Sequence, residues 1–170
     1  MIFRPDVYIA SYNDLDVQKL QNKKIKVLIV DIDNTLVASS GWDLDDQAKD
    51  FVARLKKMEI IPVVISNNIN KRVAHFAQIL QIDYYAFSLK PLPWRFYQLQ
   101  KKYHVKKEEV MIMGDQLLTD VFFAKTSGIK CILVDPLEDK DNIFGTVTRS
   151  IEKIIRKIDK FEKGAYYDKM

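Results

Sequence analysis

Cysteine and histidine are scarce in this sequence: its 170 residues include one cysteine and two histidines. The single Cys131 excludes a disulfide within the chain, and its apolar neighbours indicate a small buried side chain. His75 and His104 lie in expected helices without metal-ligand spacing, and we interpret both as structural residues. The low cysteine content fits a reducing cytoplasm.

The sequence also lacks a long hydrophobic run. No stretch approaches the roughly 20 apolar residues of a membrane-spanning helix, and residues 1–6 lack the apolar core of a signal peptide. We therefore expect a cytoplasmic protein, with a peripheral contact at the inner face of the membrane left open. With 170 residues, 48% of them hydrophobic, the chain suits a single domain over residues 1–170.

Acidic side chains are outnumbered, and the formal net charge is +4. Residues 149–170 hold seven basic and four acidic side chains, so this tail carries most of the imbalance. Its apolar residues predict a basic amphipathic C-terminal helix: Ile151, Ile154, Ile155, Ile158 and Phe161. Such a helix packs on the core or rests on anionic membrane, and both alternatives stay open. We interpret residues 1–24 as an N-terminal arm of undetermined role.

Short apolar runs and helical periodicity alternate along the rest of the chain. Strands are predicted at residues 25–31, 60–65, 84–87, 110–113 and 132–134. Helices are predicted at residues 45–58, 69–80 and 118–127, with another beginning at Pro91 or Pro93. This alternation is typical of an α/β fold with a parallel sheet and helices on both faces. Ligands bind such sheets beyond the carboxyl ends of the strands.

Two aspartates stand at the end of the first predicted strand, in the run Val27 to Thr35. Asp31 and Asp33 are separated by one residue, so an extended chain points both carboxylates the same way. Two carboxylates this close repel each other unless a metal or a shared proton relieves them. The pair therefore suggests either a magnesium site or an acid/base dyad.

The later strand ends favour the metal. They carry Ser66 and Asn67, Lys90, and Asp115 with Asp120. Carboxylates, a hydroxyl and an ammonium suit a phosphoryl group held against Mg²⁺, because Mg²⁺ binds carboxylates, waters and substrate phosphate. Lys90 can neutralise phosphoryl oxygens, while Ser66 and a backbone amide near Asn67 donate hydrogen bonds. An aspartate can then attack phosphorus while a second carboxylate handles the proton.

In order along the chain, these residues resemble the four motifs of the haloacid dehalogenase (HAD) superfamily of aspartate-nucleophile phosphatases. The matching stretches are Asp31-Ile-Asp-Asn-Thr35, Val64-Ile-Ser66-Asn67, Lys90-Pro91, and Gly114-Asp115 followed by Thr119-Asp120. The resemblance implies a HAD-like, Rossmann-like fold, Asp31 as nucleophile, and Asp33 as general acid/base that lends its backbone carbonyl to Mg²⁺. The resemblance further implies that the metal ligands are Asp31, Asp33 and Asp115. It implies a phosphate site formed by Ser66, Asn67 and Lys90. Lys90 would also pair with Asp31 in catalysis, and Asp120 would have a supporting role.

The spaces between the motifs are too short for a cap domain, so the site is expected to be open. The run Gly114 to Asp120, together with Asp31 to Leu36 and Pro5 to Tyr8, resembles the YqeG family of HAD subfamily IIIA. That family is related to mitochondrial phosphatidylglycerophosphate phosphatases. The resemblance implies an anionic phospholipid substrate, phosphatidylglycerophosphate. One departure is Lys125-Thr126-Ser127-Gly128, where the family suggests an Asn-Arg-Ala-Gly-like helix end.

Other functions remain open. A HAD phosphatase acting on a protein, a nucleotide or another macromolecular phosphate uses the same residues. A ribosome-associated or nucleic-acid-binding factor would keep the fold and use the basic tail, but no catalytic acid is lost, and we expect no nucleic-acid partner. A phospho-receiver module fits poorly, because its lysine follows the phospho-accepting strand later in the chain, whereas Lys90 precedes Asp115.

Overall fold

The computed structural model describes residues 3–138, 151–152, 155 and 163 of the chain. A six-stranded parallel sheet with the order β1-β6-β5-β2-β3-β4 forms its centre. The strands are β1 (Val7–Tyr8), β2 (Val27–Val30), β3 (Ile61–Ile65), β4 (Asp83–Tyr85), β5 (Val110–Gly114) and β6 (Lys130–Leu133). The predicted α/β fold class is confirmed, and the ends of the predicted strands agree with those of β2 to β6 to within two residues.

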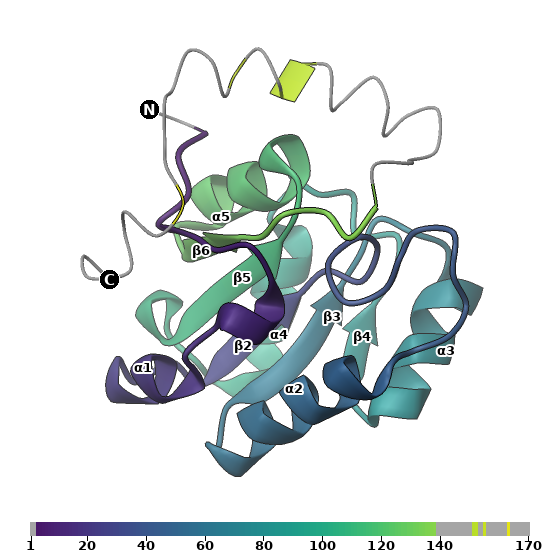
Figure 1. Ribbon diagram of the computed structural model, residues 1–170. Coiled ribbons are helices and arrows are strands. Elements are labelled where there is room, and N and C mark those ends of the chain that lie inside the picture. Colours follow the sequence, from purple (N-terminus) through teal and green to yellow (C-terminus); the bar gives the residue numbers. More distant parts are fainter. Residues whose placement is uncertain (1–2, 139–150, 153–154, 156–162, 164–170) are drawn as a thin grey trace.

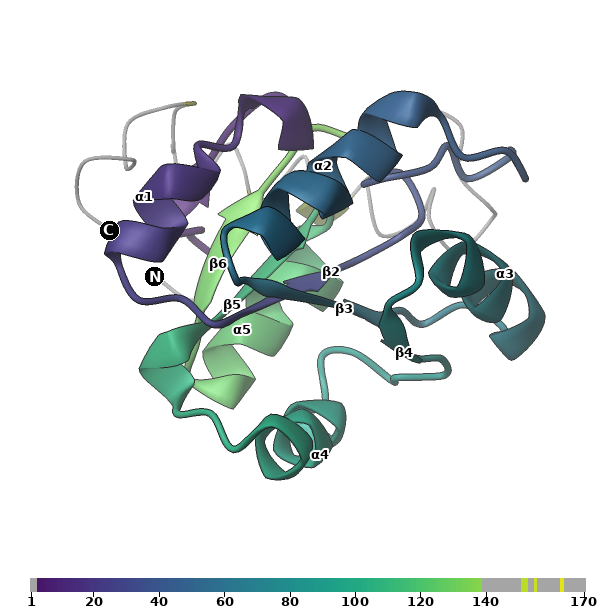
Figure 2. The same cartoon turned by 90° about the horizontal axis from the view of Figure 1, so that it is seen from below.

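Helices cover both faces of the sheet, as Figures 1 and 2 show. One face carries α1 (Val17–Asn22), α2 (Asp46–Lys57) and α3 (Asn70–Leu80), whose apolar side chains pack with alternate residues of β2. The opposite face carries α4 (Trp94–Tyr103) and α5 (Phe122–Ser127). Leu28 and Val30 of β2 belong to the first core, and Val27 and Ile29 to the second. The four-residue apolar run is therefore buried on both sides, as central parallel strands are.

Strand β2 lies at the centre of the sheet, and this position brings the site residues of its neighbours together. It pairs with β3 on one side and β5 on the other, so Val30 lies between Val64 and Met113. The chain order reverses at this strand, and the carboxyl ends of β2, β3 and β5 meet at one edge. Between these strands the described chain holds only loops, short helices and β4, with no inserted cap domain.

Residues of the expected N-terminal arm take part in the sheet. Val7 and Tyr8 form β1 and pair in parallel with Ile132 and Leu133 of β6. The side chain of Asp6 accepts a hydrogen bond from the backbone N–H of Cys131 at 2.9 Å. A two-residue strand has too little periodicity to be predicted from sequence.

Most of the expected C-terminal amphipathic helix, residues 151–161, lies outside the described residues. Of the residues that the structure does describe there, Glu152 is buried and accepts a hydrogen bond from the backbone of Leu118 at 3.1 Å. Ile155 packs against the core formed by α4 and α5, whereas Ile151 is exposed. No helix among the described residues has the length and apolar character needed to cross a bilayer.

Candidate active site

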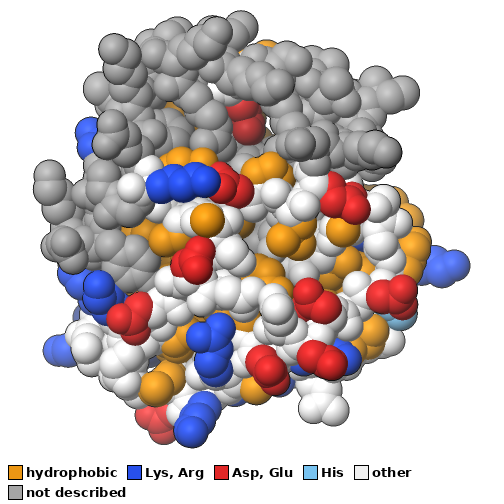
Figure 3. Space-filling view, viewed as in Figure 1, with side chains coloured by type: hydrophobic (Ala, Val, Ile, Leu, Met, Phe, Trp, Pro, Cys, Tyr) orange, Lys and Arg blue, Asp and Glu red, His pale blue; other side chains and the backbone are white. Residues whose placement is uncertain are grey.

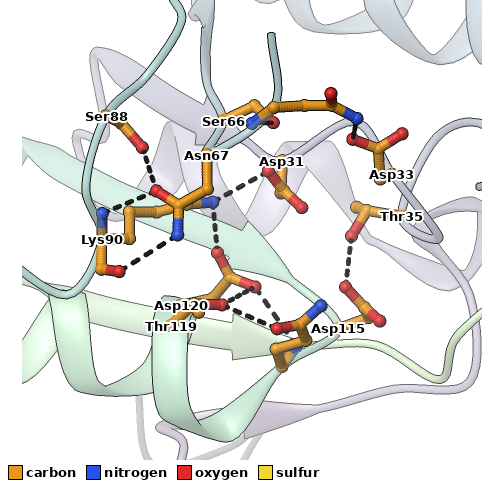
Figure 4. Close-up of polar contacts among 12 residues, drawn as sticks. Asp31, Asp33, Thr35, Ser66, Asn67, Ser88, Lys90, Asp115, Thr119 and Asp120 are labelled. Carbon is orange, nitrogen blue, oxygen red and sulfur yellow. Dashed lines mark hydrogen bonds and ion pairs between the residues drawn. The ribbon is translucent and has the colours of Figure 1, made fainter. Parts of the chain in front are cut away.

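Three strand ends bring the predicted site residues together at the edge of the sheet. Asp31 follows β2, Ser66 follows β3, and Asp115 follows β5, and all three side chains are buried. Figure 4 shows them around one shared space with Lys90 and Asp120. The structure therefore assembles side chains that are up to 89 positions apart in the sequence.

Lys90 lies between two aspartates. Its Nζ donates to Oδ1 of Asp31 at 2.8 Å and to Oδ1 of Asp120 at 2.6 Å. Burial disfavours the ammonium, but the carboxylates of Asp120 and Asp31 outweigh this cost, and the pKa of Lys90 is raised. For Asp31, burial dominates over the attraction of Lys90, and repulsion from Asp120 and Asp33 adds to it, so its pKa is raised to about 7. The lysine is thus a fixed positive charge in the site.

The side chain of Asn67 holds the loop that presents Lys90. Its Oδ1 accepts from the backbone N–H of Lys90 and from the Ser88 hydroxyl, both at 2.7 Å, and its Nδ2 donates to the Lys90 carbonyl at 3.0 Å. The expected phosphate contact of Asn67 therefore falls to its backbone N–H, which has no acceptor among the described residues. The Lys90–Pro91 peptide bond is cis.

Backbone amides next to Asp31 are also unpaired. The N–H groups of Ile32 and Asp33, which directly follow the buried Asp31, have no acceptor among the described residues. The hydroxyl of Ser66 accepts from the backbone of Asn68 at 3.2 Å, which leaves its own proton for another acceptor. Free donors beside a buried site are suited to the oxygens of a phosphoryl group.

Asp33 turns its carboxylate away from Asp31 toward two partners. Arg72 Nε donates to its Oδ1 at 2.6 Å, and Asn68 Nδ2 donates to its Oδ2 at 2.7 Å. Arg72 also donates to the carbonyls of Gly41 at 2.5 Å and Ala38 at 3.0 Å, so one buried guanidinium fixes both Asp33 and the loop after it. Sequence reasoning missed Arg72 and Asn68, although an arginine at an inward helix position was an available signal.

Three carboxylates lie close enough to share a cation. Oxygens of Asp31, Asp115 and Asp120 lie within 4.8 Å of one another, and the hydroxyl of Thr35 is 3.5 Å from Oδ1 of Asp115. A set of carboxylate oxygens is the donor chemistry that Mg²⁺ prefers, so these residues fit the implied metal. The expected ligand Asp33 contributes no side chain to this set. Its backbone carbonyl accepts no hydrogen bond from the described residues and stays the group expected to reach the metal.

Asp120 reaches the site through an unusual helical turn. Instead of the predicted continuous helix over residues 118–127, a π-helical turn (Leu117–Val121) precedes α5. Asp120 is fully buried there, and its Oδ2 accepts from the backbone N–H of Gln116 at 3.2 Å. The wider turn lets the carboxylate face Lys90, and π turns of this kind are common at functional sites.

Gly114 makes room for Asp120. A Cβ at this position would overlap the carboxylate of Asp120, whereas a Cβ at Gly41 would meet its nearest neighbour at an ordinary 3.6 Å. We expect Gly114→Ala to displace Asp120 and to destabilise the protein by about 1–3 kcal/mol through overpacking. Gly41→Ala is the matched control and should leave stability nearly unchanged. Urea unfolding of both variants measures the difference, and equal midpoints would contradict the close packing.

Comparisons with known proteins agree with this geometry. The family model of the haloacid dehalogenase-like hydrolases matches residues 8–128. "Probable phosphatase YqeG" from Bacillus subtilis (strain 168) is 30% identical over 153 residues, which cover 90% of this chain and 89% of that protein.

Solved structures show the same fold. A hydrolase from Legionella pneumophila assigned to HAD subfamily III A matches with a TM-score of 0.54 and 22% identity, over 71% of this chain and 72% of that one. The 3-deoxy-D-manno-octulosonate 8-phosphate phosphatase of Moraxella catarrhalis, solved with magnesium, phosphate and its sugar, matches with a TM-score of 0.55 and 22% identity, over 72% and 74%. At this identity the likeness supports the fold alone.

The six parallel strands form a Rossmann-like core, and the comparisons define the class of the protein as a hydrolase. The chain belongs to the haloacid dehalogenase-like hydrolases, and the expected likeness to the YqeG family is confirmed. The expected enzyme class, a phosphatase, is confirmed with it.

Proposed function

We propose that this protein is a Mg²⁺-dependent phosphomonoester hydrolase that works through an aspartyl phosphate on Asp31. The observation that carries the proposal is the position of Asp31, whose carboxylate has one oxygen 2.8 Å from the Lys90 ammonium and an oxygen within 4.8 Å of one from Asp115. Bound there by Asp31, Asp115 and the Asp33 carbonyl, the metal would neutralise charge on the phosphoryl oxygens. Asp120 then serves to position Lys90 through its 2.6 Å contact.

The protein groups divide the reaction into two steps. In the first step, an Asp31 oxygen forms a bond to phosphorus while the bond to the ester oxygen breaks, and Asp33 gives a proton to that leaving oxygen. In the second step, Asp33 takes a proton from water as the water oxygen attacks phosphorus and frees Asp31. Arg72 and Asn68 orient the Asp33 carboxylate for both transfers. Lys90, Ser66 and the backbone amides of Ile32 and Asn67 hold the other phosphoryl oxygens.

For the substrate, we propose phosphatidylglycerophosphate, whose phosphomonoester lies at the tip of a lipid head group. The absence of an inserted cap among the described residues supports a substrate presented by a larger surface. A small metabolite at an open site is less shielded from water. The YqeG-like motifs support the same choice. A soluble sugar phosphate, of the kind named for the Moraxella relative, is the competing substrate class.

Purified full-length protein with three substrates tests this proposal. We expect phosphate release from phosphatidylglycerophosphate in mixed micelles at a kcat/KM at least about 10²-fold above that for a sugar phosphate or an aryl phosphate. Chelation of Mg²⁺ should abolish all three activities. Good turnover of soluble esters with the lipid ignored would overturn the lipid substrate, and no turnover of any ester would overturn the enzymatic proposal.

The raised pKa of Asp31 predicts how pH acts on metal binding. Burial raises the pKa of its carboxyl to about 7 in the folded metal-free protein, from an ordinary value of 3.8 in the unfolded chain. The folded state therefore holds a proton that the unfolded state has lost, and metal-free stability decreases as pH rises from about 4 to 7. Since Mg²⁺ needs the carboxylate, its stabilisation should increase over the same window.

Thermal unfolding with and without Mg²⁺ at about pH 5, 6, 7 and 8 measures this dependence. The rise in melting temperature that Mg²⁺ causes should be larger at pH 8 than at pH 5, and Asp31→Asn should flatten the trend. A Mg²⁺ effect independent of pH would contradict the assignment of Asp31 to the metal.

A further inference from the structure

The loop that presents Lys90 inverts the usual relation between polarity and burial. Ser88 and Lys90 are buried, whereas Phe87 and Leu89 between them are 54% and 61% exposed. Both apolar residues have left-handed backbone, with φ of 47° at Phe87 and 55° at Leu89. Bulky side chains rarely adopt this conformation, and such strain usually persists where function requires it. An exposed, strained pair of this kind indicates a surface that another body covers.

Hydrogen bonds fix this loop so that the apolar pair stays outward. The backbone N–H of Ser88 donates to the carbonyl of Ser66 at 3.0 Å, and that of Phe87 donates to the carbonyl of Asn68 at 3.2 Å. On the far side of the loop, the indole N–H of Trp94 donates to the carbonyl of Ser88 at 2.6 Å. Turning Phe87 or Leu89 inward would break bonds that also hold Lys90 in the site.

Neighbouring positions extend the exposed apolar surface. Leu92 is 56% exposed, and Ile69, on the loop that is hydrogen-bonded to this one, is 51% exposed. Single exposed apolar side chains are ordinary, but several on two adjoining loops mark an interaction site. We call this surface the apolar rim and define it as Ile69, Phe87, Leu89, Leu92 and Trp94.

The segments that carry the apolar rim have basic side chains and lack acidic ones. The two segments that carry it, residues 66–72 and 86–97, contain four basic side chains and no acidic one. One of these, Lys71, is exposed, and the half-buried Arg95 has its guanidinium 3.7 Å from the ring centre of Trp94. The loops after β2 and β6 carry acids instead, including the exposed Asp43 and the half-buried Glu138.

An anionic bilayer matches this combination better than other occupants. Apolar side chains enter the interface, tryptophan is favoured there, and basic residues are attracted to anionic head groups. The face formed by α1 and α2 offers no such surface, because charged side chains of both signs separate its apolar ones in Figure 3.

We propose that the apolar rim docks the protein on anionic lipid bilayers, with Phe87 and Leu89 as the inserted side chains. Docking puts Lys90 one residue from the inserted pair, so a phosphomonoester standing out of the lipid surface meets the site without leaving the membrane. This consequence rests on the proposed lipid substrate, whereas the docking itself does not.

Flotation of the full-length protein with phosphatidylcholine vesicles, with and without phosphatidylglycerol, tests the docking. The double variant Phe87→Asn/Leu89→Asn removes the apolar side chains and keeps a residue that accepts left-handed backbone, so folding is retained. We expect wild type to bind the anionic vesicles and the variant to bind at least about 10-fold more weakly. Ile61→Thr is the matched control, because Ile61 is 41% exposed at the opposite edge of the sheet, and it should bind as wild type does.

Several results would overturn the proposal. The first is a wild-type protein that does not bind anionic vesicles, which is the result expected of a surface that binds an acidic protein instead. The second is a double variant that binds as tightly as wild type. The third is release of the protein from vesicles by inorganic phosphate, which would place the contact in the catalytic site. Turnover of a soluble aryl phosphate distinguishes a failure of the docking proposal from a failure of the proposed function. The double variant should hydrolyse this ester at a rate within about twofold of the wild-type rate. Rim-dependent binding without lipid hydrolysis would leave the docking in place and remove only the substrate.

Discussion

Asp31→Asn is expected to lower phosphate release by at least about 10³-fold with every substrate, because an amide is a poor nucleophile toward phosphorus. Asparagine keeps the volume of the side chain, so the buried space between Lys90 and Asp115 stays filled. Removing one carboxylate from the cluster of Asp31, Asp115 and Asp120 should also weaken Mg²⁺ binding. Steady-state turnover at saturating Mg²⁺ separates the loss of the nucleophile from the loss of metal affinity.

A chemical readout makes this prediction sharper. Acid-quenched reactions with a labelled phosphomonoester should trap phosphate covalently on wild type and leave none on Asp31→Asn. Asp50→Asn is the control, because Asp50 is exposed on α2, away from the carboxyl edge of β2. Wild-type labelling in Asp31→Asn, or retention of more than a tenth of the turnover, would assign the nucleophile to another group.

The sequence predicts the centre of this molecule well because two independent patterns coincide there. Val27–Val30 is an unbroken apolar run, and polar residues follow it and the later runs at each carboxyl end. A parallel sheet places those ends at one edge, so the convergence of Asp31, Ser66 and Asp115 follows from topology. Lys90 could be grouped with them because it follows the predicted strand at residues 84–87, but its role came from the resemblance, since a lone lysine before a proline has no pattern of its own.

What the sequence leaves out depends on contacts between distant residues. Arg72 occupies an inward position of α3, but the groups that stabilise its charge there, Asp33 and two loop carbonyls, are distant in the sequence. The π turn brings the carboxylate of Asp120 to Lys90, a contact between residues 30 positions apart. The exposed Phe87 and Leu89 break the rule that apolar residues are inside. Local rules fail at these points because the active site, rather than local propensity, determines the structure.

Lys90→Met is expected to destabilise the metal-free protein by about 3–5 kcal/mol, the usual effect of removing one partner from a buried ion pair. Methionine fills the space of the lysine stem but leaves Asp31 and Asp120 close together without a cation. Without that cation the pKa of Asp31 would rise further, so the loss of stability should be smaller at pH 5 than at pH 8. Urea unfolding in the presence of a chelator measures it, because bound Mg²⁺ would mask the missing charge.

Adding Asp120→Asn to Lys90→Met separates stability from catalysis. The second substitution removes the fully buried carboxylate whose contact with Lys90 we assign to positioning, so the double variant should recover part of the lost stability. It should recover none of the activity, because no cation then faces the phosphoryl group. Lys26→Met, at an exposed ion pair with Glu109, controls for the loss of a positive charge and should unfold as wild type does. If the double variant were no more stable than Lys90→Met alone, repulsion between the two aspartates would not be the cost that Lys90 offsets, and its charge would serve the substrate alone.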